Sequence, residues 1–191
     1  KGLDLKLFEN QIRYLKKNYN FISIEELNNA ISNSETIPEK SVLLTFDDGY
    51  KDHYDNVFPF LCSEDIKGAF YIPTKAISEN KVLDVNKIHF ILSSVKDTNL
   101  IINEIYNQLD LYRTKFNLNS NDFYFKKLAK ENRFDTKEVI FIKRILQLGL
   151  NEKLRFIITD YLFKKFVTDN EIEFSKELYV SQNEIKTMFN N

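Results

Sequence analysis

Cysteine is nearly absent from this 191-residue sequence, which contains Cys62 alone. One thiol excludes an internal disulfide and cannot build a thiolate metal site, so we expect Cys62 to act as a small apolar residue in a helix. No apolar stretch reaches the roughly 18 residues of a membrane span, so we expect no membrane-spanning segment. The start has neither an initiating Met nor a signal-peptide apolar core, so we expect the chain to begin after the natural start. The compartment of the protein stays open.

An excess of charge of one sign is also missing, because 27 basic and 28 acidic residues give a formal net charge of -1. Such a balance provides no field that would gather nucleic acid or anionic lipid, and we expect neither as a partner. Hydrophobic residues make up 43% of the chain and charged residues 29%. This composition is typical of a globular protein with a sizeable core.

The stretch Ser41–Tyr50, with the sequence SVLLTFDDGY, is an apolar run that ends in two carboxylates and a glycine. Its centre, Val42–Phe46, has the length and apolarity of a fully covered parallel strand, which places the acids at the carboxyl end. Neighbouring residues of a strand point to opposite faces, so Asp47 and Asp48 converge only if the strand breaks, and Gly49 can supply the break. Two carboxylates held together favour a bound cation or a shared proton, which points to a metal. The alternative is an ordinary strand-end turn with solvated acids.

Strand and helix patterns alternate over the first part of the chain, as in a parallel α/β sheet or barrel. Helical spacing of apolar residues predicts a helix over residues 5–18. Another helix is expected to begin near Asn56, which can cap it and leaves Pro59 in the first turn. The remaining predicted elements are a strand over 21–24, a helix over 25–31 and a strand over 68–73.

From residue 85 onward strands nearly vanish and helical patterns take over. Residues that can cap helices recur through this region and just beyond it: Thr98, Asp135 with Glu138, Asn151, and Ser181 with Glu184. We therefore predict that residues 85–177 are a helical insertion rising from a strand-to-helix loop of the α/β domain. Its apolar residues indicate either a small core of its own or a surface for a partner, so a homo-oligomer formed through the insertion is one expectation.

The string Thr45-Phe46-Asp47-Asp48-Gly49-Tyr50 resembles the first motif of the polysaccharide deacetylases, the family with the NodB-homology domain (carbohydrate esterase family four). The similarity spans residues 8–77, and the further stretches that carry it are 8–15, 21–27, 57–61 and 68–74. This resemblance implies an α/β fold that is part of an irregular (β/α) barrel with a large helical insertion. The expected domains are the barrel portion 1–84, the insertion 85–177 and a return to the barrel over 178–191.

The resemblance also implies a site and an activity. Asp47 would be the general base and Asp48 a ligand of a divalent metal, and two histidines of a His-x-x-x-His motif would complete the metal site. Tyr50 is a candidate for substrate binding. Oxygen and imidazole ligands suit zinc, with cobalt, iron or nickel as alternatives. The implied reaction is metal-dependent hydrolysis of N-acetyl, or else O-acetyl, groups of a saccharide, with an acetylated saccharide or polysaccharide as the partner.

The histidines depart from this family pattern. His53 and His89 are the sole histidines, and they lie too far apart to form the His-x-x-x-His pair. We expect His53 near the mouth of the site and His89 in a packing role. The later family motifs, one with an arginine and a proline-bearing loop and one with a leucine and a final histidine, have no counterpart. Residues 178–188 resemble the segment that leads into the histidine motif, so we expect an inactive fragment that stops before it.

Three alternatives remain open at this stage. The chain could be a carbohydrate- or partner-binding domain that lacks the metal histidines. A phosphotransferase with an acidic strand end is a weaker alternative, because such enzymes usually space their acids as Asp-x-Asp and no glycine-rich phosphate loop follows. The helical insertion could itself be the main functional part, as a dimerisation module.

Overall fold

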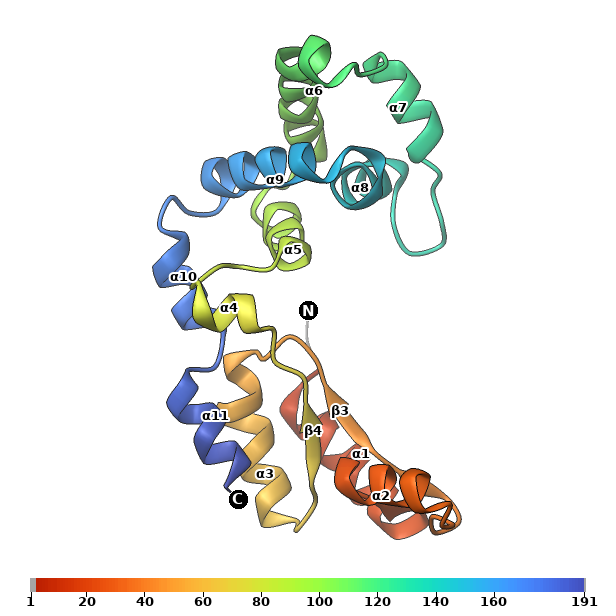
Figure 1. Cartoon of the computed structure of the whole chain (residues 1–191). Helices are drawn as coiled ribbons and strands as arrows, with labels where there is room; N and C mark the ends of the chain where they lie inside the picture. Colours follow the sequence, from red (N-terminus) through yellow and green to blue (C-terminus); the bar gives the residue numbers. More distant parts are fainter. Residues whose placement is uncertain (1–2, 191) are drawn as a thin grey trace. The chain divides into compact units, whose positions relative to one another are not determined.

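The computed structural model describes residues 3–190 (Figure 1). The chain forms two compact units, and each is described by itself. The first unit contains Lys1–Asn80 and Ser175–Asn191, and the second contains Lys81–Phe174. These boundaries lie a few residues from the predicted domains 1–84, 85–177 and 178–191, whose identity as barrel and insertion stays a prediction.

The first unit combines short parallel strands with helices. Helix α1 begins after Asp4, whose carboxylate accepts from the backbone N–H groups of Lys6 and Leu7, and it has the predicted bounds. The elements of the first unit in chain order are α1 (Leu5–Asn18), β1 (Asn20–Phe21), α2 (Ile24–Asn33), β2 (Ser41–Val42), β3 (Leu44–Phe46), the π-helix η1 (His53–Val57), α3 (Phe58–Ser63), β4 (Gly68–Phe70), α4 (Thr74–Ser78) and α11 (Gln182–Phe189). Helix α10 (Glu171–Leu178) runs across the boundary between the units in the sequence.

The strands form two parallel pairs. Strand β1 pairs with β2, and β3 pairs with β4 so that Leu44 lies opposite Gly68 and Phe46 opposite Phe70 (Figure 1). The predicted single strand Val42–Phe46 is therefore wrong in one respect: the chain changes partner at Leu43 and the ladder is interrupted there.

Burial of this segment also differs from the prediction. Most of Val42–Phe46 is half-buried and Thr45 is exposed. A fully covered strand needs neighbours on both edges and both faces, whereas β3 has one paired neighbour, β4. The strand predicted over 68–73 likewise ends at Phe70, because β3 ends at the opposite residue, Phe46. The described residues form a mostly helical α/β structure with few strands and no closed barrel, so the irregular (β/α) barrel stays a prediction.

A compact apolar core lies under α1. Its buried members are Ile12, Leu61 and Ile66, and partly buried side chains from α1, β3, β4 and α3 pack against them. Ile12 on α1 and Leu61 on α3 are each 2% exposed. The core therefore fixes β3, and with it the acids that follow β3, against two helices.

The helix predicted to begin near Asn56 begins earlier, because helical backbone already starts at Lys51. The turn from His53 to Val57 is a π-helix, in which the N–H of Phe58 donates to the carbonyl oxygen of His53. Pro59 lies two residues after this turn, and in a regular helix its ring would crowd the carbonyl four residues before it. A wider π-turn relieves this contact and lets the helix pass through Pro59.

The second unit is built from helices, and its described residues contain no strand. Asn151 caps a helix as predicted, whereas Asp97 and Thr136 cap the helices assigned to Thr98 and Asp135, one residue away in each case. The elements are α5 (Asp84–Ser94), α6 (Thr98–Phe116), α7 (Asn121–Leu128), α8 (Lys137–Arg144), the π-helix η2 (Ile145–Gly149) and α9 (Glu152–Phe166). Fully buried side chains such as Ile105, Phe141 and Ile158 give this unit a core of its own.

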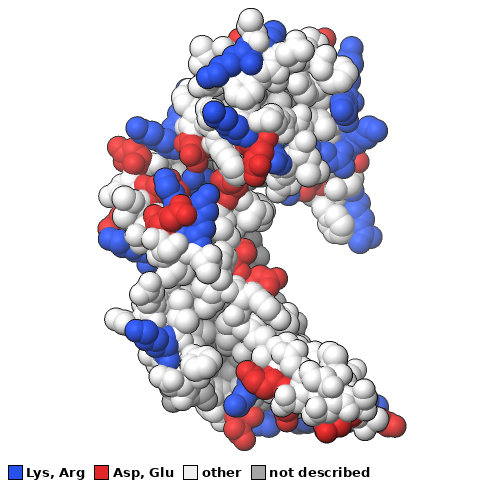
Figure 2. Space-filling model, viewed as in Figure 1, with Lys and Arg blue, Asp and Glu red and all other residues white. Residues whose placement is uncertain are grey.

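Surface charge agrees with the near-zero net charge. On the face drawn in Figure 2, acidic and basic side chains lie next to one another in many places. Among residues 3–190, no helix combines the length and apolarity that crossing a bilayer requires.

Candidate functional site

The two acids directly follow β3, at the carboxyl end predicted from the sequence. Asp48 has φ 71° and Gly49 has φ 61°, so the break begins one residue before the glycine. Asp tolerates the left-handed region better than most residues with a Cβ atom. Asp47 is exposed and Asp48 is half-buried, so at least one carboxylate is open to a solute.

The acids line a shallow pocket of about 400 Å³ together with Tyr71, Ile72 and Pro73. These three residues follow β4, and carboxyl ends of parallel neighbours meet at one edge of a sheet. The sequence interpretation missed them as lining residues, although the same strand-end rule could have found them. The pocket therefore combines two carboxylates from β3 with an apolar and aromatic wall from β4.

Gly49 is required by close packing as well as by its backbone conformation. It is buried, and a Cβ atom added there would lie 3.0 Å from Cγ2 of Ile72. A side chain would therefore push the wall of the pocket away from the acids.

The Tyr50 side chain turns toward Asp48. Burial, followed by the charge of Asp48, raises the pKa of Tyr50 to about 12, and a hydrogen bond to the Asp48 side chain contributes. The ring of Tyr50 stacks on Tyr179, with 6.0 Å between centroids and 20° between planes. The predicted substrate contact of Tyr50 stays a prediction.

His53 lies among aromatic rings behind the acids. Its ring centroid is 5.5 Å from that of Phe46, 5.8 Å from Tyr50 and 6.1 Å from Phe70. Its Nδ1 atom is buried and has no hydrogen-bond partner within the described residues. Burial lowers the pKa of His53, although nearby aspartates oppose this effect, so the ring favours its neutral form. The other histidine, His89, is exposed on α5, so the packing role predicted for it is wrong.

The carboxylates of the acid pocket form an incomplete donor set for a metal ion. Asp47 and Asp48 supply adjacent oxygen donors, but residues 3–190 contain no group of three or more His, Cys, Asp or Glu side chains arranged to hold a metal. A catalytic zinc ordinarily takes three protein ligands. The described residues therefore do not fit a complete metal centre, and the metal assignment of Asp48 stays a proposal.

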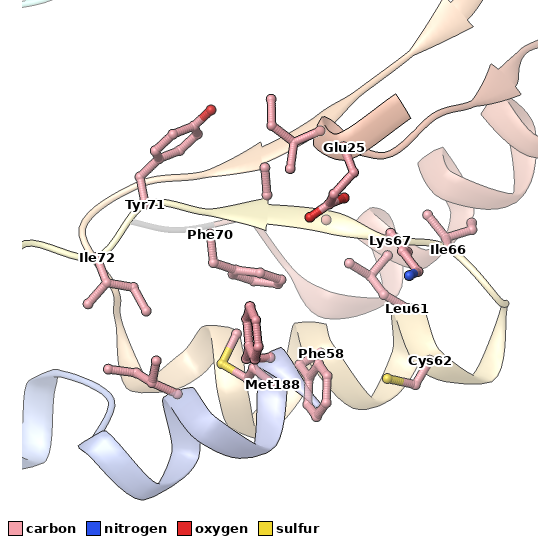
Figure 3. Close-up of a pocket in the computed structure, with 15 residues that line it drawn as sticks. Glu25, Phe58, Leu61, Cys62, Ile66, Lys67, Phe70, Tyr71, Ile72 and Met188 are labelled. Atoms are coloured by element: carbon pink, nitrogen blue, oxygen red, sulfur yellow. The ribbon is translucent and has the colours of Figure 1, made fainter. Parts of the chain in front are cut away.

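A second cavity, of about 350 Å³, runs along β4 and is bordered by α3 and α11 (Figure 3). Its lining is mainly apolar, and Phe70 lies on the side of β4 that faces the helices while Tyr71 points to the other side. Glu25 and Lys67 are the charged residues at its edge. Because this cavity offers no convergent donors, the acid pocket is the candidate active site.

Comparisons with known proteins agree on one family. Residues 34–110 match the family model described as polysaccharide deacetylase. The chain is 44% identical over 52 residues to the poly-beta-1,6-N-acetyl-D-glucosamine N-deacetylase of Escherichia coli (strain K12), which covers 27% of this chain and 8% of the relative. It is 33% identical over 73 residues to the Bacillus subtilis (strain 168) protein named "Putative polysaccharide deacetylase YxkH", which covers 38% of this chain and 26% of that protein.

The structure of the Streptococcus pyogenes deacetylase PplD in complex with acetate aligns with a TM-score of 0.37 at 19% identity, over 75% of this chain and 70% of that one. These values are too low for a structural argument. The chain spans only a small part of the curated relatives it matches. The range that matches the family model, residues 34–110, extends beyond residue 77 through α5 into α6. The resemblance seen in the sequence motifs is confirmed, because residues 34–110 match the polysaccharide deacetylase family model.

Proposed function

We propose that the protein containing this chain is a hydrolase that removes acetyl groups from N-acetylated saccharides, with O-acetylated saccharides as the second substrate class. The observation that carries this proposal is the Asp47–Asp48 pair, which lies at the carboxyl end of β3 inside the family-matched range and lines an open pocket. We further propose that the strands are part of the family's irregular (β/α) barrel and that the second unit is its helical insertion.

Asp47 is assigned as the general base because its carboxylate is exposed at the pocket. It would take a proton from the water that attacks the acetyl carbonyl carbon. The new C–O bond forms, the C–N bond breaks, the sugar amine leaves with a proton, and acetate is released. General-base catalysis of this kind contributes about 10²–10⁴-fold in rate.

Asp48 is assigned as one oxygen ligand of the divalent metal that the resemblance implies, with zinc first and cobalt, iron or nickel as alternatives. The other ligands would have to come from residues that the described structure does not bring beside it. For this reason we expect the 191-residue chain alone to be inactive.

A second candidate function is a non-catalytic domain that binds a carbohydrate or another partner. The observation that favours it is the same incomplete donor set, in which two carboxylates stand without a third metal-ligating side chain among the described residues. In this case the acid pocket would bind a sugar through hydrogen bonds to Asp47 and Asp48.

The test is an acetate-release assay on the protein encoded by the whole reading frame that contains these residues. N-acetylglucosamine oligomers and an O-acetylated glycan serve as substrates, with Asp47→Asn as the inactive variant and Asp55→Asn as its control. Asp55 is also exposed, but it lies on the π-helix and does not line the acid pocket. Acetate release that depends on Asp47 and not on Asp55 supports the hydrolase, whereas sugar binding without acetate release supports the binding domain.

A further inference from the structure

The loop that carries Asp48 is held by a segment that follows the helical unit in the sequence. The N–H of Val180 donates to the carbonyl oxygen of Gly49 over 2.9 Å, and Tyr50 forms an isolated antiparallel bridge with Tyr179. Tyr179 and Val180 are each 2% exposed. Both sides of this contact belong to the first compact unit, so the pairing is an internal feature of that unit.

The same segment supports the Tyr50 side chain. The rings of Tyr50 and Tyr179 stack with centroids 6.0 Å apart, and His53 packs edge-on against Tyr50 at 5.8 Å. The phenol is hydrogen-bonded to the Asp48 side chain. A carboxylate has two oxygens, so this bond can fix the orientation of Asp48 and leave one oxygen for the pocket.

An ion pair on the next residue adds a third point of attachment. Lys51 pairs with Glu184, whose side chain is 16% exposed. Glu184 also accepts the backbone N–H of Ser181 over 2.7 Å, while the Ser181 hydroxyl accepts the N–H of Glu184. The capping box of α11 therefore fixes the carboxylate that holds Lys51.

The acid loop needs such support because its backbone conformation is unfavourable. Asp48 has a Cβ atom and φ 71°, and Gly49 follows with φ 61°. A left-handed residue with a side chain persists where the surrounding structure over-determines it. Backbone, ring and ion-pair contacts from residues 179–184 supply that constraint here.

We propose that Tyr50 is a positioning residue for Asp48, and that residues 179–184 form a clamp that holds Tyr50 and the acid loop in place. This inference rests on the proposed role of Asp48 as a site residue. Carboxylates that bind metals are themselves oriented by hydrogen-bonding neighbours, and losing such a neighbour typically costs 10–100-fold in affinity or activity. The segments on either side of the helical unit thus build the acid site together.

The experiment compares Tyr50→Phe and Glu184→Gln with the control Tyr14→Phe. Tyr50→Phe removes one hydroxyl and keeps the ring stack, Glu184→Gln weakens the ion pair and keeps the size of the side chain, and Tyr14 is 63% exposed on α1. Amide hydrogen exchange of the 191-residue chain is measured first, because it needs no activity. The amide of Val180 should exchange on the order of 10-fold faster in Tyr50→Phe, as expected from the loss of a hydrogen bond to a charged group. It should also exchange faster in Glu184→Gln. Tyr14→Phe should leave its exchange rate unchanged.

The kinetic part uses the protein from the whole reading frame. A positioning role predicts that Tyr50→Phe lowers kcat for acetate release with little change in KM. A raised KM at unchanged kcat would make Tyr50 a substrate ligand and overturn the proposal. Unchanged exchange at Val180 in both clamp variants would overturn it regardless of kinetics. If the wild-type protein releases no acetate, the proposed function fails, and the exchange result alone decides whether the clamp exists.

Discussion

Lys87 and Glu171 form an ion pair in which Nζ lies 2.8 Å from Oε1, and the lysine side chain is only 4% exposed. Lys87 also lies 2.5 Å from Oδ1 of Asp160. Glu171 accepts the backbone N–H of Val82 and the ammonium of Lys81, each at 3.0 Å. The pair therefore joins α5, near the start of the second unit, to the first residue of α10, near the end of that unit.

Replacing Lys87 with Met should destabilise the second unit. The substitution keeps the apolar stem but removes one of the cations that pair with Glu171, which retains Lys81 and the Val82 N–H, so we expect a cost of about 1–3 kcal/mol. Lys153→Met on α9 is the control, because Lys153 is exposed and should change stability by less than about 0.5 kcal/mol. Urea unfolding followed by circular dichroism measures the difference, and equal effects of the two substitutions would contradict the role of the pair.

Stability should fall as the pH drops below about 6.5 because of His53. Burial lowers its pKa below the ordinary 6.5, so its contribution is complete above the unfolded pKa and is lost as the pH falls through the folded pKa. Glu171 and Glu184 also have lowered pKa values, but their ordinary value is 4.5, so their contributions are lost at lower pH.

The comparison of His53→Phe with His89→Gln isolates this effect. His53→Phe should flatten the pH dependence of the unfolding free energy below about pH 6.5, because phenylalanine cannot be protonated among the surrounding rings. His89 is exposed, and His89→Gln should leave the dependence as it is. The account would be contradicted if the His89 variant, and not the His53 variant, flattened the profile.

Gly49→Ala should destabilise the first unit for two separable reasons. The left-handed backbone costs roughly 1–2 kcal/mol for a residue with a Cβ atom, and the new Cβ would lie 3.0 Å from Cγ2 of Ile72. Adding Ile72→Ala removes the contact but leaves the backbone cost. A double-mutant cycle by urea unfolding should therefore show favourable coupling between the two substitutions, and zero coupling would rule out the contact.

Zinc should not bind the 191-residue chain tightly with one-to-one stoichiometry. The physical reason is that Asp47 and Asp48 are two oxygen donors without a third ligand grouped beside them in the described residues, whereas zinc sites use three or four protein ligands. Calorimetric titration at pH 7 checks this, with Asp48→Ala as the comparison. Tight binding that Asp48→Ala abolishes would show that a further residue completes the site in this chain.

Local patterns in the sequence predicted what local side chains determine. The helix over residues 5–18 and the Ser181–Glu184 capping box are confirmed, because amphipathic spacing and caps act within a few residues. Asp97 and Thr136 were missed as caps by one residue, since neighbouring residues in both cases can cap equally well. The acid pair was placed correctly after β3 because an apolar run that stops on two acids marks a strand end.

Contacts between distant segments could not be read from the sequence. Nothing near Leu43 signals that the strand exchanges one partner for another, and nothing near Tyr50 signals that Tyr179 stacks on it. The π-helix before Pro59 relieves the steric conflict between the proline ring and a regular helix. The sequence is compatible with other ways of relieving it, so the π-helix could not be predicted. These features depend on the assembled fold, and so does the orientation of Asp48.

The most direct test of the central claim measures metal content and acetate release together in Asp47→Asn and Asp48→Ala of the protein from the whole reading frame. If Asp47 is the base and Asp48 a ligand, Asp47→Asn should keep its metal and lose about 10²–10⁴-fold in kcat, whereas Asp48→Ala should lose tight metal binding. An Asp47→Asn variant that keeps full kcat, or an Asp48→Ala variant that keeps its metal, would contradict the assignment.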